Sequence, residues 1–131
     1  MKINLEVLIE LQVTEEANQV GSNEKVVWAV FGGQIPTPAI PRVGENIWLG
    51  FIDDSCKQAA TIKNVEYGLS EDGVLVPKVF CEYALPVGDE ELLEERVLKE
   101  TAMLEKTITP WFKSRHFKVL RPSSYSQRTA W

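Results

Sequence analysis

The chain is poor in the residues on which most catalytic and metal sites depend. Its 131 residues include one histidine and two cysteines. Cys56 and Cys81 are too far apart for a Cys-x-x-Cys pair, and with one histidine they make a poor zinc ligand set. Gly32-Gly33 is not followed by a phosphate-binding pattern, so we interpret it as a turn. The sequence therefore predicts no metal, no cofactor and no identifiable catalytic residue.

Long apolar runs are also missing. No stretch approaches the ~18 apolar residues that a membrane-spanning helix needs. Residues 1–6 alternate between apolar and polar, whereas a signal peptide has an unbroken apolar run after its basic start. These absences predict a cytoplasmic protein with reduced thiols and no membrane contact.

What the chain does contain is typical of one globular domain. Its residues are 44% hydrophobic and 25% charged, and its length fits a single domain. We expect this domain to span residues 1–121 and to be followed by a C-terminal tail, residues 122–131.

The net charge of −5 is unevenly distributed. Residues 1–88 carry 12 acidic and 6 basic side chains, and residues 89–106 carry 7 acidic and 3 basic ones. Residues 107–131 carry five basic side chains and no acidic one. The acidic balance disfavours nucleic acid as the default partner. The basic segment is expected to pack on its own acidic helix or on that of a second copy, or to bind nucleic acid.

Strand patterns occupy the first two thirds of the chain. Residues 2–14 alternate strictly, which predicts a strand with one solvated face, and residues 25–31 are apolar on both faces, which predicts a central strand paired with it. The proline-rich stretch 32–45 is expected to be an extended crossover. Further short strands are predicted at residues 46–51, 59–67, 74–83 and 117–120, with an Asp-Gly hairpin turn between the strands at 59–67 and 74–83.

A helix is predicted over residues 89–108. Asp89 is placed to cap it, and Thr109-Pro110 is expected to end it. Five to six short strands and one amphipathic helix near the C-terminus indicate the α+β class. The sequence favours a curved antiparallel sheet or a small, partly open β-barrel.

Few side chains suggest chemistry. Cys81 with His116 is a conceivable nucleophile and base, but a core thiol and a solvated histidine explain both more simply. Asp53-Asp54 is interpreted as a turn, and Glu66 and Glu82 are candidates to face each other across a hairpin. Trp28 and Trp48 are expected to fill the core, and Trp111 and Phe112 to pack into the core or at the helix end.

Two segments are candidate binding surfaces. The proline-rich crossover offers Ile35, Pro36 and Pro38. The basic C-terminal segment interleaves cations with aromatic rings, a combination that suits protein partners and single-stranded nucleic acid; its candidate residues are Trp111, Lys113, Arg115, His116, Lys118, Arg121, Tyr125 and Arg128.

The sequence favours a non-enzymatic protein-interaction module whose partner is another protein or a second copy of the chain. The first alternative is nucleic-acid binding through residues 111–128. The second alternative is a small enzyme with an unrecognised site.

Overall fold

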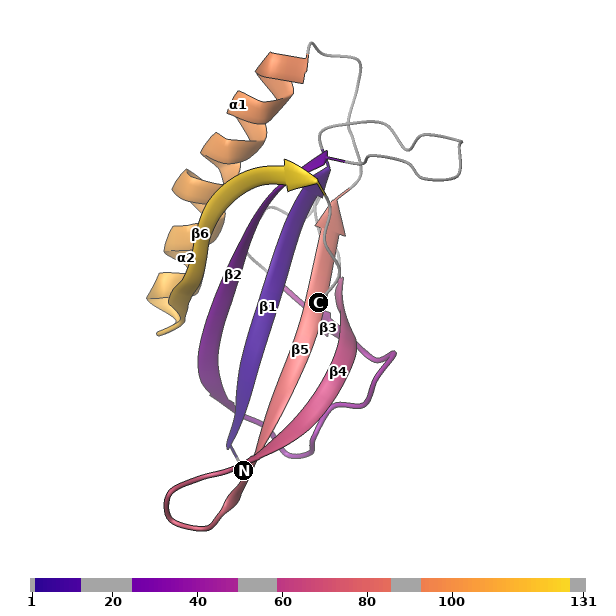
Figure 1. The fold of residues 1–131 in the computed structure, drawn as a ribbon, viewed down its shortest axis with the longest axis vertical. Coiled ribbons are helices and arrows are strands. Elements are labelled where there is room, and N and C mark those ends of the chain that lie inside the picture. Colours follow the sequence, from indigo (N-terminus) through magenta and orange to yellow (C-terminus); the bar gives the residue numbers. More distant parts are fainter. Residues whose placement is uncertain (1, 13–24, 50–58, 86–92, 128–131) are drawn as a thin grey trace.

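The computed structural model describes residues 2–12, 25–49, 59–85 and 93–127. They form a curved six-stranded sheet of order β3-β4-β5-β1-β2-β6 with a helical segment between β5 and β6, as Figure 1 shows. The fold is α+β with an open, mostly antiparallel sheet, which confirms the predicted class. The strands are β1 (Lys2–Gln12), β2 (Lys25–Pro36), β3 (Asn46–Trp48), β4 (Ala59–Leu69), β5 (Leu75–Leu85) and β6 (Lys118–Gln127).

The alternation of β1 creates the core. Ile3, Leu5, Val7, Ile9 and Leu11 are each at most 3% exposed and belong to one core cluster with Leu104, Ile108 and Phe112 of the helical segment. β1 pairs antiparallel with β2, as predicted, and parallel with β5, a long-range pairing that the sequence did not indicate.

The other face of β1, which we call the open face, is less solvated than its alternation predicted. Leu8 is 6% exposed and Glu10 is 3% exposed. Their partners in register are Val30, which is also buried, and Trp28, which is half-buried. The centre of the open face is therefore shielded as well.

The helix continues through Pro110, so the prediction that Thr109-Pro110 ends it is wrong. α1 (Leu93–Met103) passes into a π-helical turn, η2 (Leu104–Ile108), and then into α2 (Thr109–Ser114). The Thr109 N–H bonds to the Leu104 carbonyl five residues earlier, and Thr109 Oγ1 donates to the same oxygen at 2.7 Å. This wider turn relieves the clash that a proline ring makes in a regular α-helix.

Gly32 and Gly33 lie inside β2, opposite Glu6 and Leu5, and not in a turn. A Cβ at Gly33 would lie 2.9 Å from Cγ of Phe117, and one at Gly32 would lie 2.6 Å from Cδ1 of Leu120. The glycines are therefore needed because side chains pack directly on the strand.

The C-terminal strand is longer than predicted. β6 pairs antiparallel with β2 as far as Lys25↔Gln127, so residues 122–127, which we assigned to a tail, belong to the sheet. Pro122 is tolerated because β6 is an edge strand with a free side. The Trp28 Nε1–H holds the C-terminal end of β6 in place by donating a hydrogen bond to Ser126 Oγ at 2.8 Å.

The β4–β5 hairpin forms as predicted, with Gly73 at φ 77° in its turn. Pro77 fits within β5 because β1 pairs with β5 only from Lys78 onward, so that β5 has one neighbouring strand there.

The expectations for the Asp53-Asp54 turn, Cys56, the Asp89 cap and Arg128 fall outside the described residues. Within the described ranges, no helix has the length and apolar character needed to cross a membrane.

Candidate functional site

The basic C-terminal segment is docked on the rest of the chain. Trp111 is half-buried against the core, and its ring meets Phe112 edge-on at 5.0 Å between centroids. The Arg115 guanidinium lies 3.9 Å from the Trp111 ring centroid, and its Nη1 donates to the Trp111 carbonyl at 3.2 Å and to Ser114 Oγ at 3.0 Å. Trp111 and Arg115 thus stabilise the helix end.

Phe112 carries the packing between helix and sheet. It is 1% exposed and stacks on Phe31 of β2, with ring centroids 4.3 Å apart. The expectation that the two aromatic residues after Pro110 pack into the core or at the helix end is met, with Phe112 in the core and the partly buried Trp111 at the helix end.

His116 has a structural position at the end of α2. Its φ is 66°, the only positive φ of a non-glycine residue among those described. His116 N–H bonds to the Lys113 carbonyl and Phe117 N–H to the Phe112 carbonyl, both at 3.0 Å. This pattern is a Schellman motif with histidine where glycine is usual.

The other candidates of the segment within the described residues are exposed on or near β6. Arg121 lies 5.9 Å above the Trp28 ring, and Tyr125 is 42% exposed. Lys113 and Lys118 are exposed. The segment is joined to the body by strand pairing with β2 and by Ser123 Oγ, which donates to Glu105 Oε1 of the acidic helix at 2.7 Å.

Cys81 and His116 do not form a catalytic pair. Cys81 is fully buried in the core, and burial raises the pKa of its thiol to about 12. His116 is exposed at the turn after α2. At pH 7 the Cys81 thiol is protonated and shielded from solvent, which is the environment of an inert core cysteine.

The candidates of the crossover divide between core and surface. Ile35 packs against the core, whereas Pro36 and Pro38 are exposed. Trp48 is 70% exposed on β3, so the expectation that it fills the core is wrong. It lies on a three-residue edge strand, where little else can cover it.

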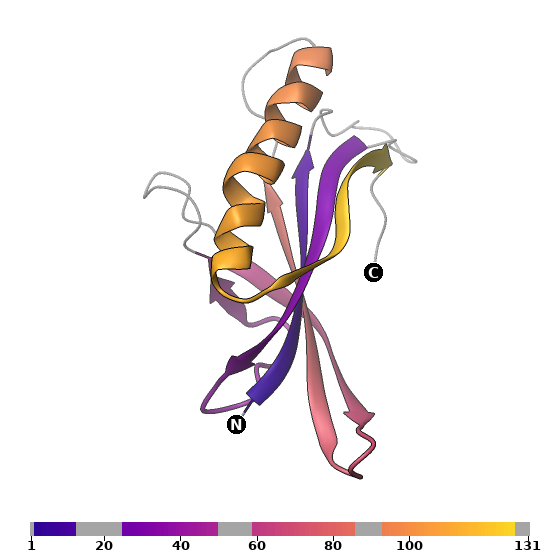
Figure 2. The ribbon, with the colours of Figure 1, turned by 90° about the vertical axis from the view of Figure 1, so that its left-hand side faces the viewer.

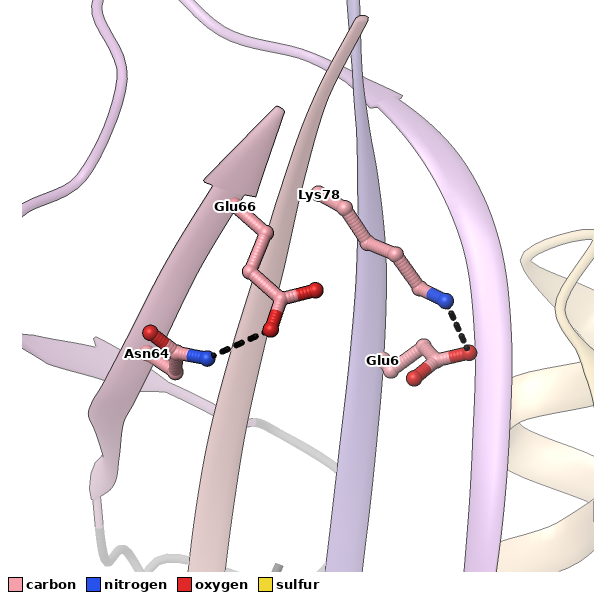
Figure 3. A network of polar contacts seen from close by, with 4 residues as sticks. All are labelled: Glu6, Asn64, Glu66 and Lys78. Atoms are coloured by element: carbon pink, nitrogen blue, oxygen red, sulfur yellow. Dashed lines mark hydrogen bonds and ion pairs between the residues drawn. The ribbon is translucent and has the colours of Figure 1, made fainter. Parts of the chain in front are cut away.

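An open groove of about 650 Å³ crosses the open face near the start of β1. His116 and Lys118 are the only sequence-predicted candidates that line it, together with Asn4, Glu6, Gln34 and Lys78. Lys78 Nζ lies 3.3 Å from Glu6 Oε1, and Asn64 Nδ2 donates to Glu66 Oε1 at 2.9 Å, as Figure 3 shows. The Glu6 carboxylate thus offsets the charge of Lys78 in the groove. Within the described ranges, no group of three or more His, Cys, Asp or Glu side chains could hold a metal ion.

Glu66 and Glu82 do not face each other. The register of the β4–β5 hairpin places Glu66 opposite Lys78 and Glu82 opposite Thr61. The hairpin therefore pairs opposite charges and holds no carboxylate dyad.

Among the residues that the structure describes, a group of exposed apolar side chains lies in a segment that the sequence did not indicate as a binding surface. The β4–β5 hairpin extends past the sheet, away from the helix, as Figures 1 and 2 show. Four apolar side chains are exposed along it, and we call them the hairpin tip: Tyr67 (56%), Leu69 (72%), Val74 (58%) and Leu75 (62%). The available signal was the run of apolar residues on both sides of the Asp-Gly turn.

The outer edge of β4 is also open beside the hairpin tip. β3 pairs only with Ala59–Thr61, and Ile62 bonds to the backbone of Gly44 and Glu45 at 2.9 and 2.8 Å. From Lys63 to Leu69 no other part of the described chain pairs with this side of the strand. We call residues 63–69 the β4 edge.

The β4 edge has two different faces. By register, Val65, Tyr67 and Leu69 lie on the face of the sheet that carries the core, and Asn64 and Glu66 lie on the polar open face.

No protein-family model, curated protein or solved structure matches this chain.

Proposed function

We propose that the chain is a non-enzymatic protein-interaction module that binds a protein partner through the hairpin tip and the β4 edge. The observation that carries the proposal is the run of four exposed apolar side chains on a hairpin that extends past the sheet. Monomeric soluble proteins rarely expose large contiguous apolar patches, and such patches often mark protein contacts. An open strand edge beside the patch adds backbone donors and acceptors for strand addition.

The basic segment supports a partner contact less strongly than the hairpin. Trp111 and Arg115 contact each other, and Trp28 holds Ser126 and lies beneath Arg121. Rings engaged in this way offer little face for stacking nucleic-acid bases. We therefore keep protein binding ahead of nucleic-acid binding.

The proposal can be tested by site-specific photo-crosslinking in cells that express the chain. A benzophenone amino acid replaces Leu69 in one variant and Leu98 in another. Leu98 on α1 is a matched control because it is 71% exposed, against 72% for Leu69. We expect discrete protein adducts at position 69 that excess unlabelled chain suppresses, and few at position 98.

Equal adduct yields at positions 69 and 98 would contradict the proposal. So would adducts at position 69 that excess unlabelled chain does not reduce, because a specific site is saturable.

A further inference from the structure

We propose that the groove on the open face is a binding site for a small organic phosphate, whose phosphate group contacts His116 and Lys118 and whose carbon part packs on Leu120. This site is separate from the protein contact proposed above, because none of the four hairpin-tip residues lines the groove. It follows from the strand register that forms the groove, from the charges around it and from the residue at the turn after α2.

The groove forms where Gly32 leaves a gap in a row of side chains across the sheet. Strand register places Gly32 of β2 beside Glu6 of β1 on one side and beside Lys118 of β6 on the other. Residues paired in this way share one face of the sheet, so the missing side chain leaves a hollow between Glu6 and Lys118. Leu120 lies directly over Gly32 and is still 47% exposed. The hollow therefore has an apolar wall between charged ends.

A second row of polar side chains borders the first on the same face. Register pairs Asn4 of β1 with Gln34 of β2 and with Lys78 of β5, and all three line the groove. The amide group of each Asn or Gln side chain supplies two N–H donors. The groove thus combines neutral donors with cations, and both kinds of group bind phosphate oxygens.

The charges around the groove leave Lys118 available for an anionic ligand. Glu6 is the one acidic residue among those that line the groove, and its carboxylate contacts Lys78 Nζ at 3.3 Å, as Figure 3 shows. β2 separates the strands of Glu6 and Lys118, so their backbones are about 10 Å apart. Within the described part of the chain, no carboxylate forms an ion pair with Lys118 or His116. A bound anion would supply that missing charge.

His116 occupies a turn position that glycine would fit better. Its φ of 66° strains a residue with a Cβ, and its exposed side chain lines the groove. Strained residues cluster at functional sites, where the side chain has a use that outweighs the strain. An imidazole donates a hydrogen bond in its neutral as well as its charged form. His116 is therefore suited to hold a phosphate oxygen together with Lys118.

The number of donors favours a phosphate over a carboxylate. A phosphate monoester offers three acceptor oxygens and up to two negative charges, whereas a carboxylate offers two oxygens and one charge. The groove presents His116, Lys118 and two amide side chains from three different segments. Its volume of about 650 Å³ suits a small organic molecule, and Leu120 gives the carbon part of that molecule an apolar surface.

The test is a titration of the untagged chain followed by nuclear magnetic resonance at constant pH and ionic strength, with phenyl phosphate as the probe. His116 is the only histidine, so its ring signals are assigned without ambiguity. We expect saturable shifts of these signals and of the backbone amides of Asn4, Gln34 and Lys118, and none with sodium chloride. Inorganic phosphate should bind roughly fivefold more weakly, because it has no apolar part to bury on Leu120. Benzoate, which lacks the phosphate, should also bind more weakly.

Three variants locate the site. Lys118→Gln removes the cation and His116→Gly removes the imidazole, and each should weaken phenyl phosphate binding roughly tenfold, the effect of losing one hydrogen bond to a charged group. Glycine suits the left-handed turn, so weaker binding by His116→Gly is not explained by a misfolded chain. Lys106→Gln is the matched control, because Lys106 is also an exposed lysine but does not line the groove. It should bind phenyl phosphate as the native chain does.

The assignment would be overturned if phenyl phosphate caused no saturable shift at His116, or if Lys118→Gln and Lys106→Gln bound it equally well. Inorganic phosphate or benzoate that binds as tightly as phenyl phosphate would also overturn it, because the groove would then not select an organic phosphate. The crosslinking at position 69 depends on none of these results, so the proposed function and this site stand or fail separately.

Discussion

Gly33 is the residue where the helix end meets the sheet. A Cβ at this position would lie 2.9–3.2 Å from three ring atoms of Phe117, and Phe117 is 9% exposed. A ring buried in this way has little room to move, so Gly33→Ala introduces overpacking. We expect the free energy of unfolding to fall by about 1–3 kcal/mol, measured by urea denaturation at one fixed protein concentration.

Gly68→Ala is the matched control for Gly33→Ala. Gly68 also lies in a strand, but a Cβ there meets no atom within 4 Å. Replacement of a strand glycine by alanine is then neutral or stabilising by up to about 1 kcal/mol. Equal destabilisation by the two substitutions would show that the contact with Phe117 does not decide the effect.

The Gly32-Gly33 pair also shows where sequence reasoning fails at the level of a residue. A glycine pair after an apolar run indicates a turn if only local preference is considered. Here Phe117 and Leu120, more than 80 positions later in the chain, pack onto the strand and require the missing side chains. No local pattern around Gly33 contains that information.

At the scale of the element, the end of the helix depends on His116. Its left-handed backbone lets Phe117 turn back onto Phe112, with ring centroids 5.3 Å apart. A residue with a Cβ is strained in this conformation, whereas glycine is not. We expect His116→Gly to raise the free energy of unfolding by about 1 kcal/mol, measured by thermal unfolding followed by circular dichroism.

Lys113→Gly tests the same change one turn earlier. Lys113 is exposed in α2, where the backbone is right-handed and glycine costs up to about 1 kcal/mol. His116→Gly should therefore raise the midpoint temperature of thermal unfolding, and Lys113→Gly should lower it. A lowered midpoint in both variants would be incompatible with strain at position 116.

The helix itself was predicted in kind but not in extent. The apolar spacing that ends in Leu104 and Ile108 identified the buried stripe, and both residues are fully buried. The sequence predicted that the helix ends at Thr109, because a proline at position 110 would disrupt a regular α-helix. The π-helical turn removes that conflict, and a single change of helical pitch is not encoded in residue spacing.

At the scale of the whole molecule, local strands were predictable and their partners were not. The alternation of β1 and the Asp-Gly hairpin of β4–β5 are local signals, and both predicted the strands correctly, although the second face of β1 is more buried than its alternation predicted. The parallel contact of β1 with β5 joins distant segments, for which the sequence offers no periodicity. The hairpin tip was missed for a related reason, since exposure of Tyr67 and Leu69 depends on how far the neighbouring strands extend.

The distribution of charge has a structural meaning that the net charge does not convey. The basic C-terminal segment supplies an edge strand of the sheet. Its contacts with the body include strand pairing, the Trp28–Ser126 hydrogen bond and the Ser123–Glu105 hydrogen bond. The segment therefore stabilises the fold, and Lys118 and Arg121 are exposed on its edge strand.

This role predicts that residues 122–127 are required for stability. They pair with the start of β2, where Val26 is 2% exposed and Val27 is 1% exposed. A chain that ends at Arg121 uncovers these side chains and leaves backbone groups of β2 without partners. We expect its free energy of unfolding to fall by about 2–5 kcal/mol, the scale of burying one or two aliphatic side chains, measured by urea denaturation followed by circular dichroism.

A chain that ends at Gln127 is the control, because it keeps every described pair between β2 and β6. It should unfold near the native midpoint. If the two shortened chains unfold at the same urea concentration, residues 122–127 act as a dispensable tail. If only the shorter one is destabilised, the segment is part of the domain, because its strand pairs with the edge of β2 that β1 does not occupy.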